Sequence, residues 1–306
     1  MINQDKNTSF RFLDELTNSG LFNTEEQVIE NYDVLVDYVR DWLESNEYDT
    51  AMACFELLLE KKNGKLRGDG KSPSALHEIS QAIYTISLIE DGVGLADPES
   101  VIALNFLHDL GEEYGVKAPK LMEQFKKFNC SIGGQRLTIL LRDFDLITKQ
   151  YKGEPPKYKS EWEYYLPMQQ SENVSVAKLI DRLHNIATIV GVKDSLRCRE
   201  YITNTTVIVN DFVKHAVEKF PLQTVAYESL KQMIDTVCQI NRYYLAQDEI
   251  GKPLPLASQI MADEMPELGF KVPKGLNPIF LAARRCSERM PKAVIASDTR
   301  NKPAPY

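Results

Sequence analysis

Helical periodicity runs through almost the whole of this chain. Apolar residues recur three or four positions apart, and the alternation of apolar and polar residues that marks half-buried strands is scarce. The pattern predicts helices over these segments: two within 23–61, then 73–91, 101–115, 117–129, 134–150, 160–166, 175–192, 195–219 and 222–247. We therefore expect an all-α fold, built as a helical bundle.

Two proline-containing segments predict where helices begin. Asp97-Pro98 precedes the segment 101–115, and Ser72-Pro73 precedes the segment that ends near residue 91. Aspartate and serine are favoured N-cap residues, and proline is favoured at the first helical position because an N–H there would have no intrahelical partner. We therefore expect one helix to begin at Pro73 and another at Pro98.

The sequence changes character after residue 250. Eight of the fifteen prolines lie between Pro253 and Pro305, and only one short helix is predicted there, over 278–289. We expect three regions: N-terminal helices over 1–57 that pack on the core, a helical core domain over 58–250, and an irregular, proline-rich C-terminal extension over 251–306.

Charge and hydropathy restrict the partners of this protein. A net charge of −8 and an isoelectric point near 5.2 argue against a general nucleic-acid binder, which needs a basic surface. No segment approaches the roughly 18 consecutive apolar residues of a membrane span, and the N-terminal residues lack the apolar stretch of a signal peptide. We expect a cytoplasmic protein with a small-molecule partner and no nucleic-acid or membrane partner. The sequence pattern indicates no oligomeric state.

Four residues have side chains that suit a transition-metal site. The chain contains four histidines, and His108 is followed directly by Asp109 within an otherwise apolar predicted helix. Neighbours on a helix point about 100° apart, so both reach one ion only if it lies between them and other helices supply further ligands. His77 and Asp181, each on a separate predicted helix, are the candidates. Two imidazoles and two carboxylates suit Mn²⁺, Fe²⁺ or Zn²⁺ better than Ca²⁺.

Two acidic residues follow the His-Asp pair by one helical turn. Glu112 lies four residues after His108, and Glu113 lies four residues after Asp109. Carboxylates in these positions can orient or deprotonate an attacking water. The alternative interpretation of the same two residues is a solvated acidic surface.

The predicted helix over 175–192 carries a polar stripe opposite its apolar one. Its members occur at positions i, i+3, i+4 and i+7: Asp181, His184, Asn185 and Thr188. A merely solvated helix surface favours lysine, glutamate and glutamine instead. The stripe therefore predicts the wall of a polar pocket.

Two sequence blocks, LHDLGEEYG (107–115) and AKLIDRLHNIATI (177–189), resemble the hydrolase domain of the RelA/SpoT alarmone enzymes, within the HD phosphohydrolase superfamily. The order His77, His108-Asp109, Asp181 is the motif order of that superfamily. The block LHDLGEEYG (107–115) is similar to the family's LHD-x-x-ED, and the more specific block AKLIDRLHNIATI (177–189) is similar to KLADRLHN-x-x-T. With weaker similarities at LITKQ (146–150) and RCREYITNT (197–205), the resemblance covers about residues 62–215.

The resemblance implies an HD-domain bundle that holds a single Mn²⁺. The residues it implies are the metal ligands His77, His108, Asp109 and Asp181, the water-assisting acids Glu112 and Glu113, the nucleotide contacts Asn185 and Thr188, and the phosphate-binding Arg67 and Lys71. The implied reaction is hydrolysis of the 3′-pyrophosphate of a stringent-response alarmone (ppGpp, pppGpp or ppApp). Its products are the nucleoside 5′-di- or triphosphate and pyrophosphate.

The chain departs from the family pattern at three positions. Glu113 stands where the family usually has aspartate, and Glu78 replaces the proline that commonly follows the first histidine. Arg67 lies one residue farther from His77 than in the family pattern. The choice between guanine and adenine therefore stays open.

Two other functions are alternatives at this stage. The first is another HD phosphohydrolase: a deoxynucleotide triphosphohydrolase, a nucleotidase, a cyclic-nucleotide phosphodiesterase or an NADPH phosphatase. Dinuclear members need further histidines, and only His184 and His215 remain beside the ligand set, which favours a mononuclear site. The second is a catalytically silent HD protein that binds a nucleotide. All the ligand and acid positions are filled, so nothing in the sequence favours loss of activity.

Overall fold

The computed structural model describes residues 25–66, 73–128, 130, 132–189 and 195–249. Within these segments the regular secondary structure is helical, apart from an isolated antiparallel bridge between Leu66 and Pro73. The expected all-α fold is therefore confirmed for this part of the chain. The helix predicted over 278–289 and the extension over 251–306 lie outside the described residues.

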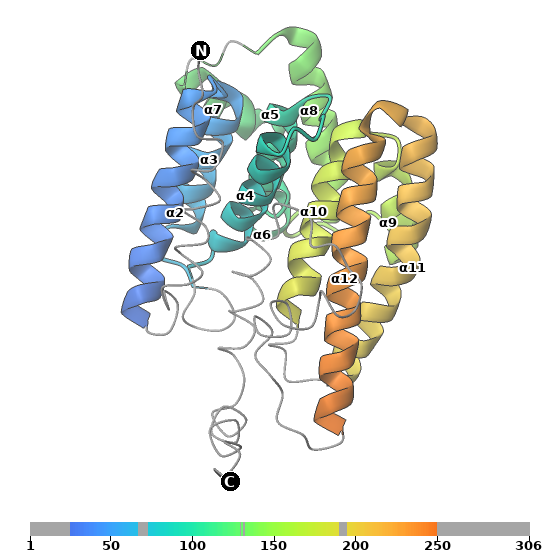
Figure 1. Cartoon of the computed structure of the whole chain (residues 1–306). Coiled ribbons are helices and arrows are strands. Elements are labelled where there is room, and N and C mark those ends of the chain that lie inside the picture. Colours follow the sequence, from blue (N-terminus) through green and yellow to red (C-terminus); the bar gives the residue numbers. More distant parts are fainter. Residues whose placement is uncertain (1–24, 67–72, 129, 131, 190–194, 250–306) are drawn as a thin grey trace, which may run out of the picture. The chain divides into compact units, whose positions relative to one another are not determined.

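The helices follow the predicted segments closely (Figure 1). In chain order they are α2 (Glu25–Ser45), α3 (Asp49–Lys62), α4 (Leu76–Glu90), α5 (Pro98–Leu107), α6 (Leu110–Tyr114), α7 (Ala118–Lys127), α8 (Gly134–Ile147), α9 (Glu161–Met168), α10 (Glu172–Thr188), α11 (Ser195–Lys219), the 3-10 turn η2 (Pro221–Gln223) and α12 (Thr224–Glu249). None of the described helices is both long and apolar enough to cross a bilayer.

The chain divides into two compact units. Among the described residues, the larger unit comprises those within 28–181 and 208–231, and the smaller one comprises 25–27, 182–189, 195–207 and 232–249. The boundaries between the units fall inside α10, α11 and α12. The three regions expected from the sequence stay a prediction.

Helix α5 is the centre of the larger unit. It contacts α3, α4, α6 and α8, and every residue of α5 after Pro98 is buried. Its sequence, PESVIALNFL, is apolar around most of its circumference, which is typical of a helix covered on all sides. The aromatic rings of Phe55 on α3 and Phe106 on α5 pack with their centroids 5.1 Å apart. His108 and Asp109, which directly follow α5, are therefore held by a close-packed core.

Only one of the two expected helix starts is confirmed. Pro98 opens α5, and the side chain of Asp97 accepts a hydrogen bond from the backbone N–H of Ser100. The expectation for Pro73 is wrong, because α4 begins at Leu76. Pro73 instead belongs to the bridge with Leu66, and the next residue, Ser74, donates its N–H to the carbonyl of Lys65.

The predicted helix over 101–115 is interrupted at the His-Asp pair. Helix α5 ends at Leu107, His108 and Asp109 form a turn, and α6 begins at Leu110. The backbone of Asp109 has φ −92° and ψ −14°, which is displaced from ideal helical values. Helix α6 ends at Tyr114, and the φ of 66° at the following Gly115 is a left-handed conformation that glycine adopts without a steric penalty.

The smaller unit contains the end of α10 and parts of α11 and α12. Asn241 donates from its side chain to the carbonyl of Ile186 at 2.7 Å, which joins α12 to α10. The guanidinium of Arg182 lies over the ring of Tyr201, 4.5 Å from its centroid, and so links α10 to α11.

Candidate metal centre

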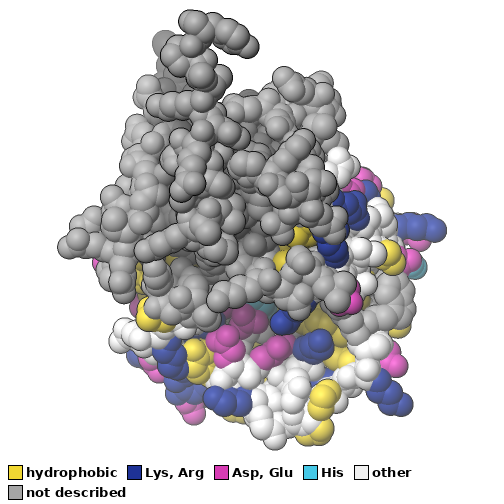
Figure 2. All heavy atoms as spheres, turned by 90° about the horizontal axis from the view of Figure 1, so that it is seen from below, with side chains coloured by type: hydrophobic (Ala, Val, Ile, Leu, Met, Phe, Trp, Pro, Cys, Tyr) yellow, Lys and Arg dark blue, Asp and Glu magenta, His cyan; other side chains and the backbone are white. Residues whose placement is uncertain are grey.

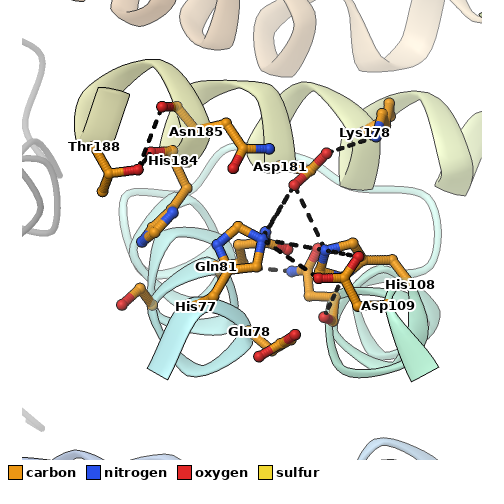
Figure 3. A network of polar contacts seen from close by, with 12 residues as sticks. His77, Glu78, Gln81, His108, Asp109, Lys178, Asp181, His184, Asn185 and Thr188 are labelled. Carbon is orange, nitrogen blue, oxygen red and sulfur yellow. Dashed lines mark hydrogen bonds and ion pairs between the residues drawn. The ribbon is translucent and has the colours of Figure 1, made fainter. Parts of the chain in front are cut away.

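Three separate helical segments of the larger unit bring together the four predicted metal ligands (Figure 3). His77 lies in the first turn of α4, His108 and Asp109 form the turn between α5 and α6, and Asp181 lies on α10. The side chains of His77, His108 and Asp181 are buried, whereas that of Asp109 is 30% exposed. The cluster thus has a closed side and a more open side, at Asp109.

The lone-pair atoms of these ligands converge on one place. His77 Nε2 and His108 Nε2 are 3.3 Å apart, and they lie 3.3 and 3.5 Å from Asp181 Oδ1. Asp109 Oδ1 lies 3.4 Å from His108 Nε2, and its Oδ2 lies 4.0 Å from His77 Nε2. Ligands at 2.0–2.2 Å from one ion are themselves roughly 3–3.5 Å apart, so the spacing fits a shared cation.

The turn at His108 and Asp109 explains how adjacent residues serve one site. On a continuous helix their side chains would diverge by about 100°. The changed backbone of Asp109 relieves this constraint, and the imidazole of His108 is fixed separately because its Nδ1–H donates to the carbonyl of Asn105 at 2.9 Å. With Nδ1 protonated, the lone pair of Nε2 faces the cluster, as a metal-binding histidine requires.

A buried lysine holds the outer oxygen of Asp181. Lys178, one turn earlier on α10, places its Nζ 2.6 Å from Asp181 Oδ2 and 5.1 Å from the centre of the Tyr164 ring. Burial raises the pKa of Asp181, but Lys178 and the two imidazoles outweigh burial and hold it well below its ordinary value. Burial lowers the pKa of Lys178, and the facing carboxylate more than reverses that effect. Asp181 therefore stays ionised, with Oδ1 directed at the imidazoles.

Gln81 also belongs to this cluster and was not identified from the sequence. Its side-chain nitrogen donates to His77 Nε2 at 2.8 Å and to Asp181 Oδ1 at 3.1 Å. Gln81 is fully buried on α4, four residues after His77. The spacing places both side chains on one face of the helix and was the one signal available in the sequence.

Glu112 lies in a partly buried position near the cluster. Its Oε1 accepts a hydrogen bond from the backbone N–H of Lys149 at 2.7 Å. Burial raises the pKa of Glu112 above its ordinary value, and the charge of Asp109 adds to the rise. A carboxylate with a raised pKa accepts a proton more readily near neutral pH, which is what the predicted role requires.

Glu113 is tied to a buried lysine on α3. Lys62 Nζ lies 2.9 Å from Glu113 Oε2 and 2.6 Å from Glu78 Oε1. The side chains of Lys62 and Glu78 are 2% and 0% exposed, whereas that of Glu113 is 44% exposed. Glu78, the residue that replaces the family's proline, is therefore the buried anchor of an ion triad between α3, α4 and α6.

The structure does not test the four predicted substrate contacts. Arg67 and Lys71 lie outside the described residues. Asn185 and Thr188 follow Asp181 on α10 but belong to the smaller unit, and the Thr188 hydroxyl donates to backbone carbonyls of α10. Their contact with a nucleotide stays a prediction.

The donor set fits a divalent cation on the geometry of this cluster itself. Two imidazole lone pairs and a carboxylate oxygen lie within about 3.5 Å of one another, an arrangement that is repulsive unless a proton or a cation lies among them. Among the described residues, two groups of side chains could hold a metal ion: His77, His108 and Asp181, and the overlapping set Glu78, His108 and Asp109. His215, half-exposed and bonded to Asp211, belongs to neither group.

The described surface carries both signs of charge. Figure 2 shows aspartate and glutamate side chains next to lysine and arginine side chains on one face, rather than an extended basic area among the described residues drawn there. This distribution agrees with the acidic net charge.

Comparisons with known proteins identify no relative. No family model matches the chain, and searches of the curated proteins and of the solved structures give no significant match.

Proposed function

We propose that this protein is a metal-dependent phosphohydrolase that removes the 3′-pyrophosphate from a nucleotide alarmone. The observation that carries the proposal is the convergence of His77, His108, Asp109 and Asp181, the first and last of which are 104 residues apart. Glu112 lies close enough for the charge of Asp109 to raise its pKa. Such a set is common in hydrolytic metal sites and unusual in a helical core without a ligand.

Three of the four ligands are prepared for one ion. Asn105 fixes the tautomer of His108, and Lys178 keeps Asp181 ionised. Asp109, the more exposed ligand, leaves room on its side for substrate. When bound, a divalent ion of this class, with Mn²⁺ as our choice, supplies a Lewis acid that polarises a phosphoryl oxygen and acidifies water.

Glu112 is the proton acceptor in this proposal. Water attacks the phosphorus attached to the ribose 3′ oxygen, and the bond between that phosphorus and the 3′ oxygen breaks. The released 3′ oxygen takes up a proton from solvent and becomes the 3′-hydroxyl. The proton lost by the water passes to Glu112, whose raised pKa suits that task. Glu113, held by Lys62, orients the water beside it. The products are pyrophosphate and the nucleoside 5′-di- or triphosphate.

The choice of an alarmone as substrate depends on the sequence resemblance. The blocks 107–115 and 177–189 contain Asp109, Glu112, Asp181, Asn185 and Thr188 in the order and spacing that the RelA/SpoT hydrolases use. Asn185 and Thr188 are the proposed nucleotide contacts, and Arg67 and Lys71 are the proposed phosphate-binding cations. A cytoplasmic location follows from this substrate class.

A substrate panel tests the proposal. The purified full chain is incubated with Mn²⁺ and ppGpp, pppGpp, ppApp, dGTP, cyclic di-GMP or NADPH, and the products are separated by anion exchange. We expect pyrophosphate release from an alarmone, abolished in Asp109→Ala. Glu123→Ala, which removes an exposed carboxylate on α7, is the matched control and keeps full activity.

Other outcomes of the panel decide between the remaining functions. Turnover of dGTP, cyclic di-GMP or NADPH alone retains the metal centre and overturns the alarmone assignment. Absence of turnover together with absence of bound metal overturns the hydrolase and favours a silent nucleotide-binding protein.

A further inference from the structure

The side chain of Gln81 lies within the ligand cluster, beside His77 and facing Asp181 (Figure 3). It is fully buried, and its backbone carbonyl is held by the Thr85 hydroxyl and the Asn105 side chain. Its position is therefore set by the packing of α4 against α5. An ion bound among these ligand atoms would therefore lie next to the Gln81 side chain.

The oxygen of this amide is the unusual atom. Gln81 Oε1 is buried and has no hydrogen-bond partner among the described residues, whereas Nε2 has two. A buried acceptor without a hydrogen bond loses its interaction with water and gains nothing in return, so this orientation has a substantial penalty. A half-turn about the last side-chain bond exchanges oxygen and nitrogen without moving other atoms, because this torsion is broadly two-fold.

The two orientations suit different states of the cluster. With the nitrogen inward, Gln81 donates to the lone pair of His77 Nε2, the same lone pair that a metal ion would need. While His77 Nε2 carries a lone pair, the oxygen can turn inward only if a cation lies among His77, Asp181 and the amide, because otherwise three acceptors would face one another. A bound cation therefore displaces the present hydrogen bond and favours the orientation with oxygen inward.

We propose that Gln81 is a fifth protein ligand, through Oε1, of the divalent ion; this inference rests on the proposed function. A neutral amide oxygen is a hard ligand and raises the number of protein donors from four to five. Five donors plus water suit the octahedral preference of Mn²⁺, whereas Zn²⁺ sites usually have four ligands in total. Gln81 therefore adds selectivity for an oxygen-preferring, six-coordinate ion over Zn²⁺.

Metal binding to the full-length protein tests this ligand. Mn²⁺ affinity is measured by competition with a chelator, and the number of bound waters is measured from EPR line broadening in ¹⁷O-enriched water. The variants are Gln81→Leu, which removes the donor, and Gln81→Glu, which retains an oxygen. Ser80→Ala, which alters a half-buried side chain that bonds only to its own helix, is the matched control.

We expect Gln81→Leu to bind Mn²⁺ about ten-fold or more weakly, to lose less affinity for Zn²⁺, and to gain one bound water. Gln81→Glu should bind Mn²⁺ at least as tightly as the wild type, with an unchanged number of bound waters. Gln81→Leu should melt near the wild-type temperature in EDTA, because leucine also removes the unsatisfied oxygen. Gln81→Glu should melt below the wild type in EDTA, because its carboxylate faces that of Asp181, and Mn²⁺ should restore its melting temperature. Gln81→Glu keeps the test valid if the leucine variant does not fold.

Two results overturn the inference and are separable. If the wild type binds no divalent ion, the proposed function fails together with the fifth ligand. If the wild type binds Mn²⁺ but Gln81→Leu binds it equally or more tightly, with the same number of waters, only the ligand role fails. Gln81 would then be a donor that competes with the ion for His77.

Discussion

The ammonium nitrogen of Lys178 lies 2.6 Å from Oδ2 of Asp181, one turn further along α10, while Oδ1 of the same carboxylate faces the two imidazoles. The two carboxylate oxygens therefore have different roles. Oδ2 is paired with the lysine inside the protein, and Oδ1 is available to a cation. The side chains of Lys178 and Asp181 are 12% and 6% exposed, so water competes little for either partner.

Replacing Lys178 by methionine should destabilise the metal-free protein by about 3–5 kcal/mol, because Asp181 would keep its charge in a buried position without compensation. Mn²⁺ should then raise the melting temperature of Lys178→Met more than that of the wild type, since the ion supplies the missing positive charge. Thermal unfolding in EDTA and in Mn²⁺ measures both effects.

Lys149→Met is the control for that experiment. The ammonium of Lys149 also lies near the ring of Tyr164, at 5.7 Å, but Lys149 is exposed. Its loss should change the free energy of unfolding by no more than about 0.5 kcal/mol. An equal metal-induced shift in the wild type and in Lys178→Met would contradict the proposed division of the carboxylate.

Glu112→Gln should remove the proton acceptor with little change in shape, because the amide oxygen can still accept from the N–H of Lys149. We expect kcat to fall by about 10²–10⁴-fold with little change in Mn²⁺ affinity. Steady-state kinetics and chelator competition separate the two quantities. A kcat within a factor of three of the wild type would exclude Glu112 as the base.

The same variant should change the pH dependence of stability. The folded-state pKa of Glu112 is raised by burial, so the folded protein binds this proton more tightly than the unfolded chain does. Its contribution to stability is present below the unfolded-state pKa of about 4.3 and is lost as the pH rises through the folded-state pKa. Glu112→Gln should therefore gain stability relative to the wild type between pH 4 and pH 7 in EDTA. Urea unfolding at the two pH values measures this; a constant difference would contradict it.

The helices could be predicted from the sequence because their periodicity is a local property. Helices α11 and α12 were located almost to the residue, and the Asp97-Pro98 start was confirmed by the bond from Ser100 to Asp97. The helix start expected at Pro73 was not confirmed, because Pro73 forms a bridge with Leu66 and the helix begins only at Leu76. No local sequence rule predicts that bridge.

The ligand set was also foreseeable, but the residues that support it were not. His108-Asp109 attracts notice in an apolar segment, whereas Gln81 and Lys178 are ordinary residues of helices until tertiary packing buries them. The ammonium of Lys178 lies near the rings of Tyr164 and Tyr165 on α9, 5.1 and 5.9 Å from their centroids, and this contact cannot be read from the spacing in the sequence. Lys62 and Glu78 meet across two helices, and nothing in their spacing predicts a buried ion pair.

Lys62 and Glu78 should be coupled strongly in stability. Lys62→Met leaves Glu78 buried without its cation and should cost about 3–5 kcal/mol, whereas Glu113 can turn into solvent at little cost. The double variant Lys62→Met/Glu78→Leu should recover most of the loss, because Glu78 Oε2 already lacks a partner among the described residues. Urea unfolding of the wild type, Lys62→Met, Glu78→Leu and the double variant measures the coupling.

Lys61→Met serves as the neighbouring control, since Lys61 bonds an adjacent, half-exposed glutamate. It should be neutral. If the double variant stayed as unstable as Lys62→Met alone, the buried pair would not be the source of the loss.

Gly111 should control the placement of both acids, because it lies directly before Glu112 on α6. A Cβ at this position would lie 2.6 Å from Thr148 Cγ2 and 2.9 Å from Thr148 Oγ1, so α6 would have to move away from the end of α8. Gly111→Ala should therefore lose about 1–3 kcal/mol of stability and most of the kcat, with a smaller effect on Mn²⁺ affinity.

Gly111→Ala/Thr148→Ala should restore much of the activity, because it removes both close atoms. Gly134→Ala, at an open position that begins α8, should behave as the wild type. If Thr148→Ala gave no rescue, the displacement of α6 would not explain the loss, and steady-state kinetics on the four proteins would show this directly.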